Sequence, residues 1–331
     1  MTSFASNPMP LPDSATDFLL RQAERVRRLS RLQRIVFPEG GDTRVQEAAQ
    51  RLEAGKLVQP ILVTAESAKA DPRLAKYTAL LLERRRAKGM TQAEAAQLAA
   101  RPLYFSCLMV ASGDADGFVG GATNSTADTV RAALQAIGPQ PKVTTVSTFM
   151  LLCVHNRSFG HQGVLTIADP AMVVEPTPVE LADITIATAA SVRSLLGIEP
   201  VVAMLSFSTK GSGKHRKSDA VVEAFRIVRE RAPELHVDAE LQADAALIEA
   251  VGRAKAPGST VPGKVNTLIF PDLNAANIGY KLVERLGDAA AIGPFLQGLA
   301  KPANDLSRGC SAGDIYGAAL VTALQAGAAR T

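Results

Sequence analysis

Short apolar runs alternate with longer segments of helical periodicity along most of the chain. Runs rich in β-branched and other apolar residues and bounded by glycine, proline or aspartate predict strands. The strands expected on this basis are 34–37, 59–63, 117–119, 142–149, 163–168, 200–206, 237–241 and 267–270.

Between these runs, apolar residues recur three and four positions apart, which is the spacing of one face of a helix. Asp42 precedes one such segment as a capping residue, and Thr91 with Glu94 forms a capping box before another. The stretch 103–110 is apolar throughout and fits either a buried strand or a buried helix. The expected helices are 17–32, 43–53, 77–87, 92–100, 126–137, 178–195, 218–231, 244–255, 274–286 and 311–325.

Strands separated by helices of this length predict an α/β fold with a largely parallel sheet. The 331 residues suit two domains at roughly 100–200 residues each. Proline and glycine gather at 138–141 and 293–302, which are the expected seams.

The composition narrows the class of protein. Hydrophobic residues make up 47 % and charged residues 21 %, which excludes extensive disorder. The net charge of +4 permits anionic ligands. Aromatic residues are only 5 % and tryptophan is absent, so stacking platforms for bases are scarce and no nucleic-acid partner is expected.

Cysteine and histidine usage argues against disulfides and metal. The three cysteines lie far apart without a CxxC pair, and the histidines show no HExxH spacing, so we expect reduced thiols and no metal site.

The apolar stretch 103–111 is far shorter than the ~20 residues of a membrane span. No secretory signal is visible, and acidic residues interrupt the arginines at 21–34, unlike a mitochondrial presequence. We therefore expect a cytoplasmic location and no membrane partner.

Polar residues gather in two loops that precede helices. In 120–128, Ser125 and Thr126 come before a helix that carries Arg131, which could form a phosphate pocket or simply a helix cap beside a surface arginine. In 301–314, Ser307, Arg308 and Asp314 could bind phosphate and move a proton, or Asp314 could merely favour the helix start. Cys310 has no histidine nearby in sequence, and we interpret it as a bystander.

Two further segments leave their function open. The turn 209–214 fails the phosphate-loop pattern, because Ser208 and His215 stand where that pattern needs Gly and Ser or Thr. Its glycine, serine and lysine residues could still meet an anion, or form a plain basic loop. In 272–281, Asn277 lies inside an expected helix and suggests contacts elsewhere, while Asn274 could be a cap.

Six ordered blocks together resemble the phosphate acetyl/butyryltransferase family, and within it the short form of phosphate acetyltransferase (phosphotransacetylase). The match as a whole runs over nearly the entire chain, from about Val36 to Gln325. The blocks are DADG at 114–117, STADTVR at 125–131, SFSTKGS at 206–212, FPDLNAANIGYK at 270–281, QGLAKP at 297–302 and NDLSRG at 304–309.

The resemblance implies an activity and an architecture. The family interconverts acetyl-CoA and phosphate with acetyl phosphate and CoA, with CoA as a substrate and without a tightly bound cofactor. The resemblance implies a fold of two α/β/α domains with mostly parallel sheets, similar to isocitrate/isopropylmalate dehydrogenase. It also implies an active site in the interdomain cleft. Domain I would be discontinuous, with residues 1–144 and 298–331, and domain II would take 145–297. A homodimer and functional coupling to acetate kinase are also implied.

The resemblance also assigns roles to residues. Asp314 matches a general base for the CoA thiol, Arg308 a ligand of the phosphoryl group, and Ser307 a hydroxyl that supports the transition state. The substrate-binding matches are Arg131, Arg85 (or Arg84 or Arg86 under a small alignment slip), Ser125, Thr126, Ser147, Lys210, Asn277 and Lys281. Asn124 stands where relatives often carry His, and Ala132 where they often carry Pro.

Two alternatives stay open. A phosphate butyryl- or propionyltransferase would share the fold and chemistry, because acyl length depends on a few pocket side chains. A non-catalytic acetyl-CoA-sensing domain would share the fold alone, but the presence of Ser307, Arg308 and Asp314 argues against it.

Overall fold

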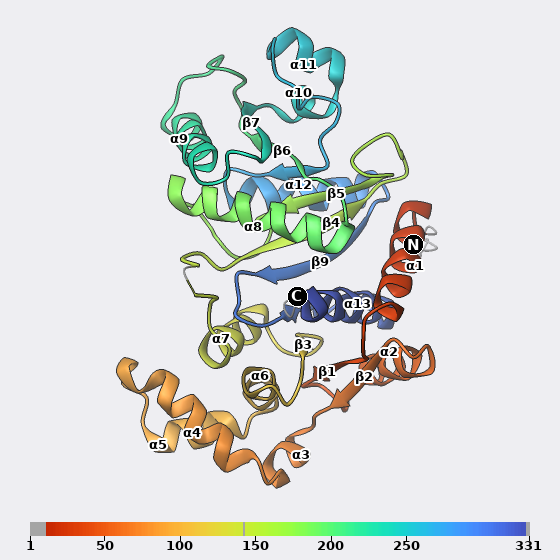
Figure 1. The fold of residues 1–331 in the computed structure, drawn as a ribbon, viewed down its shortest axis with the longest axis vertical. Helices are drawn as coiled ribbons and strands as arrows, with labels where there is room; N and C mark the ends of the chain where they lie inside the picture. Colours follow the sequence, from red (N-terminus) through yellow and green to blue (C-terminus); the bar gives the residue numbers. More distant parts are fainter. Residues whose placement is uncertain (1–10, 142, 329–331) are drawn as a thin grey trace, which may run out of the picture. The chain divides into compact units, whose positions relative to one another are not determined.

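The computed structural model of the protein describes residues 11–141 and 143–328, which form an α/β structure with two separate sheets (Figure 1). These residues group into two compact units. Unit 1 holds those up to Leu20 together with Phe149–Val192 and Ile198–Ile292. Unit 2 holds Arg21–Thr148, Arg193–Gly197 and those from Gly293 onward.

The sheet of unit 2 has four strands in the order β10-β3-β1-β2, and every neighbouring pair is parallel. Helices α2 and α13 contact this sheet and each other, and so do α6 and α7 (Figure 1). The strands are β1 (Gln33–Phe37), β2 (Val58–Leu62), β3 (Gly117–Gly120) and β10 (Ala303–Asp305). The helices are α2 (Thr43–Ala54), α3 (Ala65–Ala70), α4 (Leu74–Arg85), η1 (Arg86–Lys88), α5 (Gln92–Ala99), α6 (Pro102–Ser112), α7 (Thr126–Ala136) and α13 (Ala312–Ala328).

The apolar stretch 103–110 is helical and forms the centre of α6. Every residue from Leu103 to Val110 is buried, so no polar face marks a period in the sequence. This is why hydrophobic patterning could not separate helix from strand here.

The second sheet has six strands in the order β7-β6-β8-β5-β4-β9. Pairs β6–β7, β6–β8 and β5–β8 are parallel, whereas β4–β5 is antiparallel. The strands are β4 (Ser147–Cys153), β5 (Val164–Ala168), β6 (Val201–Leu205), β7 (His236–Leu241), β8 (Thr267–Ile269) and β9 (Ala290–Gln297). The remaining helices are α1 (Asp13–Arg27), α8 (Pro178–Leu196), α9 (Arg216–Arg231), α10 (Ala243–Leu247), α11 (Glu249–Lys255) and α12 (Leu273–Leu286). The prediction of an α/β fold with mostly parallel sheets is confirmed.

Several expected elements need correction. The expected strand 142–149 is wrong in its bounds: β4 begins at Ser147 and runs to Cys153, and residue 142 lies outside the described residues. The expected helix 244–255 is two helices, because Ile248 adopts an extended conformation between them. Strands β9 and β10 and helix α3 were not expected. Gly293 and Pro294, the start of the expected seam 293–302, lie inside β9, and the chain passes from unit 1 to unit 2 at Gly293.

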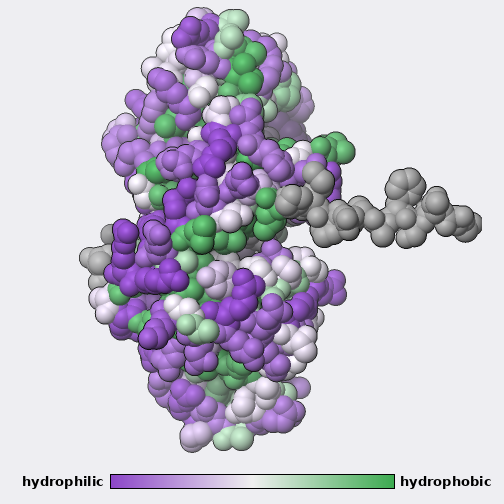
Figure 2. Space-filling view, turned by 90° about the vertical axis from the view of Figure 1, so that its right-hand side faces the viewer, coloured by the Kyte–Doolittle hydropathy of each residue, from purple (hydrophilic) through white to green (hydrophobic). Residues whose placement is uncertain are grey.

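Within the described part of the chain, no helix is both long enough and apolar enough to cross a bilayer. On the face drawn in Figure 2, apolar side chains form scattered patches among hydrophilic ones. All three cysteines are buried free thiols.

Candidate active site

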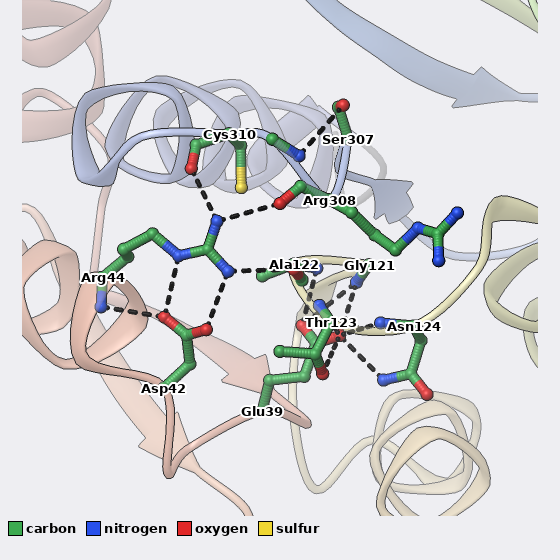
Figure 3. A network of polar contacts seen from close by, with 11 residues as sticks. Glu39, Asp42, Arg44, Gly121, Ala122, Thr123, Asn124, Ser307, Arg308 and Cys310 are labelled. Atoms are coloured by element: carbon green, nitrogen blue, oxygen red, sulfur yellow. Dashed lines mark hydrogen bonds and ion pairs between the residues drawn. The ribbon is translucent and has the colours of Figure 1, made fainter.

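Three loops of unit 2 meet at the carboxyl edge of its parallel sheet. They follow β1 (38–42), β3 (121–125) and β10 (306–311), which are neighbours or near neighbours in the sheet. Figure 3 shows residues of these loops side by side. Open α/β sheets bind ligands at this edge, so the loops are the natural place to look for a site.

The three predicted catalytic residues lie in the last of these loops and in the first turn of α13, and all are exposed. The Oγ of Ser307 accepts the N–H of Gly309 at 3.3 Å. The guanidinium of Arg308 has no hydrogen-bond or ion-pair partner among the described residues. A planar cation without an internal partner can grip a phosphoryl group through two hydrogen bonds.

Asp314 caps the helix in which it lies. Its Oδ2 accepts both the N–H and the hydroxyl of Ser311 at 2.8 Å. Oδ1 has no partner among the residues that the structure describes. The capping role is therefore realised, and it leaves one carboxylate oxygen available for a proton.

The predicted phosphate pocket at α7 has a well-formed cap. The Oγ of Ser125 accepts the N–H of Asp128 at 3.1 Å and donates to its Oδ2 at 2.8 Å. Arg131 forms an ion pair with Asp128 at 2.7 Å. The cap and the surface arginine of the alternative interpretation are thus both present, and they leave the binding role a prediction.

Glu39 is a site residue that the sequence analysis missed. Its buried carboxylate accepts the backbone N–H groups of Gly121 (3.1 Å), Ala122 (3.0 Å), Thr123 (2.9 Å) and Asn124 (3.1 Å). The side-chain amide of Asn124 donates to the same carboxylate at 2.8 Å (Figure 3). Successive N–H groups that converge in this way form an anion-binding nest. Nothing local in the sequence around residues 38–41 shows what the carboxylate meets.

Arg44 joins the three loops. Its guanidinium pairs with Asp42 at 2.8 Å and donates to the carbonyls of Ala122 (2.9 Å), Arg308 (3.0 Å) and Cys310 (2.8 Å) (Figure 3). The hydrogen bond from Arg44 lowers the pKa of Asp42. Arg44 therefore fixes the backbone of the loop that carries Arg308 relative to the loop before α7.

Asp305, the last residue of β10, is a second buried carboxyl next to these loops. Its Oδ1 has no hydrogen-bond partner among the described residues. Burial raises its pKa to about 6, the Thr126 and Thr129 hydroxyls oppose the shift, and the charge of Glu39 adds to it. This places the hydroxyl of Thr126, a predicted substrate ligand, against a buried acid.

A basic cavity of about 460 Å³ brings two predicted substrate arginines together. Its basic lining side chains are Arg85, Lys88, Arg101 and Arg131. The Nε of Arg85 is buried and has no partner within 11–141 and 143–328. Arg84 instead donates to the Ile137 carbonyl at 2.6 Å, and neither it nor Arg86 lines the cavity. The geometry thus favours Arg85 over the two alternatives.

Ser147 and Lys210 make internal contacts. The buried Oγ of Ser147 accepts from Gln297 at 2.9 Å. Lys210, in unit 1, pairs with Asp238 at 2.5 Å and also donates to the Ala239 carbonyl. In the same turn, the N–H of Gly211 donates to Glu240 at 2.9 Å. The two donors of this turn that could bind an anion, the Lys210 ammonium and the Gly211 N–H, are therefore already bound to carboxylates of the chain.

Two further predicted ligands lie on α12 in unit 1. Asn277 donates its side-chain amide to the Pro170 carbonyl at 3.1 Å, which gives this interior asparagine a contact outside its helix. The Nζ of Lys281 lies 5.0 Å from the ring centroid of Tyr280. Asp272, and not Asn274, caps α12, because its carboxylate accepts the N–H of Ala275 at 2.9 Å.

No group of three or more His, Cys, Asp or Glu side chains in the described part of the chain is arranged to hold a metal ion.

Comparisons with known proteins bear on this site. The family described as phosphate acetyl/butaryl transferase matches residues 18–323. The chain is 42 % identical over 327 residues to a phosphate acetyltransferase of Acetivibrio thermocellus, covering 93 % of this chain and 98 % of the relative. It is 46 % identical over 299 residues to one from Paracoccus denitrificans, covering 88 % and 94 %. A crystal structure of a phosphotransacetylase from Streptococcus pyogenes superposes with a TM-score of 0.88 at 41 % identity, covering 95 % of this chain and 99 % of that one.

Proposed function

The chain belongs to the phosphate acetyl/butaryl transferase family, and from that premise we propose that it transfers an acetyl group reversibly between coenzyme A and inorganic phosphate. It is an acyltransferase. The observation that carries the proposal is a group of three side chains on one loop and the helix after it. Among the described residues, the Arg308 guanidinium and one Asp314 carboxylate oxygen have no partner, and Ser307 adds a hydroxyl.

In this proposal Asp314 is the base. Its Oδ1 takes the proton of the CoA thiol, because a free thiol such as that of cysteine, with a pKa of about 8.5, forms little thiolate at neutral pH. The thiolate attacks the carbonyl carbon of acetyl phosphate, the carbon–oxygen bond to phosphate breaks, and phosphate leaves. Arg308 stabilises the negative charge that gathers on the phosphate, and Ser307 donates a hydrogen bond to the transition state. In the reverse direction a phosphate oxygen attacks acetyl-CoA, and the departing thiolate regains the proton.

Substrate binding is proposed for the remaining candidates. Arg85 and Arg131 share a basic cavity that suits phosphate groups, and Ser125 and Thr126 lie at the N-terminus of α7, where backbone N–H groups favour an anion. Lys281 and Asn277 would contact CoA. For Lys210 and Ser147 a binding role requires that their present internal partners be exchanged for substrate.

Direct transfer in a ternary complex needs neither an acyl-enzyme nor a tightly bound cofactor, and we propose this route. The rival substrate within the family is a longer acyl group. Rates with acetyl-CoA and butyryl-CoA separate the two, and a preference for butyryl-CoA would contradict the acetyl assignment. A non-catalytic acetyl-CoA-sensing domain would bind acetyl-CoA without turnover.

We also propose a cytoplasmic homodimer that is coupled in function to acetate kinase, with acetyl-CoA, phosphate and acetyl phosphate as its small-molecule partners. Helix α12 supports the dimer, because it exposes an apolar face that a second copy could cover. The exposed fractions are 58 % for Ile278, 53 % for Leu282, 39 % for Val283 and 80 % for Leu286.

The deciding experiment is release of CoA from acetyl-CoA, followed through its free thiol, with and without inorganic phosphate. We expect release that saturates with phosphate and is matched by formation of acetyl phosphate. Release that does not depend on phosphate, or no release, would contradict the proposed function.

A further inference from the structure

We propose that Glu39 is a positioning residue for phosphate binding: its buried carboxylate holds the β3–α7 loop in the shape that presents the N-terminus of α7. It does this without contacting substrate. The inference rests on the proposed function, because it concerns the phosphate groups that this reaction handles.

The acceptor capacity of Glu39 is taken up by the loop. Oε1 accepts from the N–H of Thr123 at 2.9 Å and from the N–H and side-chain amide of Asn124 at 3.1 and 2.8 Å. Oε2 accepts from the N–H of Ala122 at 3.0 Å, and the N–H of Gly121 lies 3.1 Å from both oxygens. Because both carboxylate oxygens are bound to the loop, we assign Glu39 the role of shaping the loop.

The nest that Glu39 fills is the kind of backbone arrangement that otherwise receives a bound phosphate or carboxylate. Here the anion is supplied by the chain itself. Without it, four backbone N–H groups would lose the carboxylate that holds them together, which favours rearrangement of the loop.

The turn that carries Glu39 is itself well anchored. The Glu39 carbonyl accepts the N–H of Asp42 at 2.9 Å, and the N–H of Gly40 donates to Val63 at 3.0 Å. A Cβ on Gly40 would lie 3.0 Å from the backbone nitrogen of Val63, which is tighter than most Cβ contacts, so glycine suits this close approach. The carboxylate is therefore presented from a rigid support, as a residue that orients others requires.

The β3–α7 loop that Glu39 holds is connected both to the start of α7 and, through Arg44, to the loop that carries Arg308. Asn124 immediately precedes Ser125, the cap of α7, so the nest fixes where the free N–H groups of that helix point. The carbonyl of Ala122 accepts from Arg44, which also holds the carbonyl of Arg308. Loss of the Glu39 carboxylate should therefore disturb both the α7 terminus and the loop that bears Arg308.

The test is the steady-state kinetics of Glu39→Ala in the direction of acetyl phosphate synthesis. We expect KM to rise by about tenfold or more, because displacements of an ångström at a site have effects of this size. A rise in KM for inorganic phosphate assigns the loop to that substrate, and a rise in KM for acetyl-CoA assigns it to the CoA phosphates. Unchanged KM values for both in the folded variant would overturn the proposal.

Formate provides a readout that a merely structural role would not move. A cavity of about 530 Å³ is lined by Glu39, Thr123 and Asn124, so a small carboxylate can reach the nest once the side chain is shortened. We expect added formate to lower the raised KM of Glu39→Ala and to leave the parent unchanged. The absence of any effect on Glu39→Ala would mean that the nest does not act through an anion.

Two variants complete the design. Glu39→Gln fills the space but presents an amide to the N–H groups, so it should show the raised KM without formate rescue. If Glu39→Ala does not fold, the KM values of Glu39→Gln decide.

Asp116→Asn removes another buried carboxylate of unit 2, which pairs with Arg31 and Arg34. It should lower the stability of the fold and leave the KM values unchanged. Failure of the proposed function is distinguishable, because the parent itself would then lack phosphate-dependent CoA release.

Discussion

Asp314 fills the capping role at the start of α13 and keeps one carboxylate oxygen for the base role that sequence reasoning had set against it. Its Oδ2 closes the first turn of α13 through Ser311, while Oδ1 has no partner among the described residues. Sequence alone identified Asp314, Arg308 and Ser307 through a resemblance, and their roles stay predictions. Glu39 could not be found in the same way, because its partners at 121–124 lie more than 80 positions away and contribute mainly backbone N–H groups, which carry no residue-specific signal.

Replacing Asp314 by Asn tests its proposed role as a base while keeping its role as a helix cap. An amide oxygen still accepts the hydrogen bonds of Ser311, so we expect an unchanged melting temperature. The amide cannot take the thiol proton, so kcat should fall by roughly 10²–10⁴-fold, the usual contribution of a general base. Steady-state rates together with a thermal melt measure both effects, and a variant as fast as the parent would remove Asp314 from the mechanism.

Asp305 makes stability depend on pH. Its pKa is about 6 in the folded protein against an ordinary value of 3.8, so between these values the folded state binds more protons than the unfolded state. This contribution favours folding most below pH 4 and is lost as the pH rises through 6. Asp305→Asn mimics the protonated acid, so it should raise the melting temperature above pH 6 and change it little below pH 4. Equal shifts at pH 4 and pH 7 would contradict this assignment.

At the scale of elements, hydrophobic period predicted strands and helices well wherever one face is buried and the other is polar. The prediction failed where that contrast is absent, as in α6. It also failed where glycine and proline lie inside an element, as Gly293 and Pro294 do in β9. Strand β10 (Ala303–Asp305) has two polar residues among its three, Asn304 and Asp305, so the sequence shows no apolar run there. The loop with Arg308 follows directly after β10. The position of this loop therefore depends on a strand that the sequence pattern did not predict.

The β3–α7 loop depends on Gly121. Its φ of +108° is a conformation that other residues rarely adopt, and a Cβ there would lie 2.6 Å from the Leu306 carbonyl oxygen and would also clash with Oδ1 of Asp305. We expect Gly121→Ala to lower the free energy of unfolding by about 1–3 kcal/mol.

Gly41 offers the matched control for Gly121→Ala. A Cβ on Gly41 would meet nothing within 4 Å, and its φ is not in the left-handed region. Gly41→Ala should therefore stay within about 0.5 kcal/mol of the parent in denaturant unfolding. Equal losses in the two variants would show that the strain at Gly121 is not the cause.

At the scale of the whole molecule, the chain supplies unit 2 from several separate segments, including its last strand and helix. Contacts between segments far apart in sequence are what local patterning cannot predict, so the discontinuous domain was expected only from the resemblance to a family. The expected domain bounds, 1–144 with 298–331 and 145–297, stay a prediction.

The proposed homodimer has a direct test on α12. Light scattering should give about twice the mass of the 34.8 kDa chain, since closed twofold dimers are the commonest assembly. Leu282→Glu with Leu286→Glu should shift the protein toward monomer, because charges would replace an apolar contact. Persistence of the dimer in this variant would place its interface elsewhere, and a parent of monomer mass would contradict the homodimer itself.

The burial of the three cysteines has a practical consequence for enzymology. Burial raises the pKa of the Cys107 and Cys310 thiols, which keeps them in the unreactive protonated form. Cys107 and Cys153 have no exposed surface, and Cys310 exposes only 7 % of its surface. Colorimetric disulfide reagents attack thiolates that they can reach, so the folded enzyme contributes little colour of its own. CoA release can therefore be recorded continuously with the reagent present from the start, and a slow rise in colour without substrate becomes a measure of unfolding.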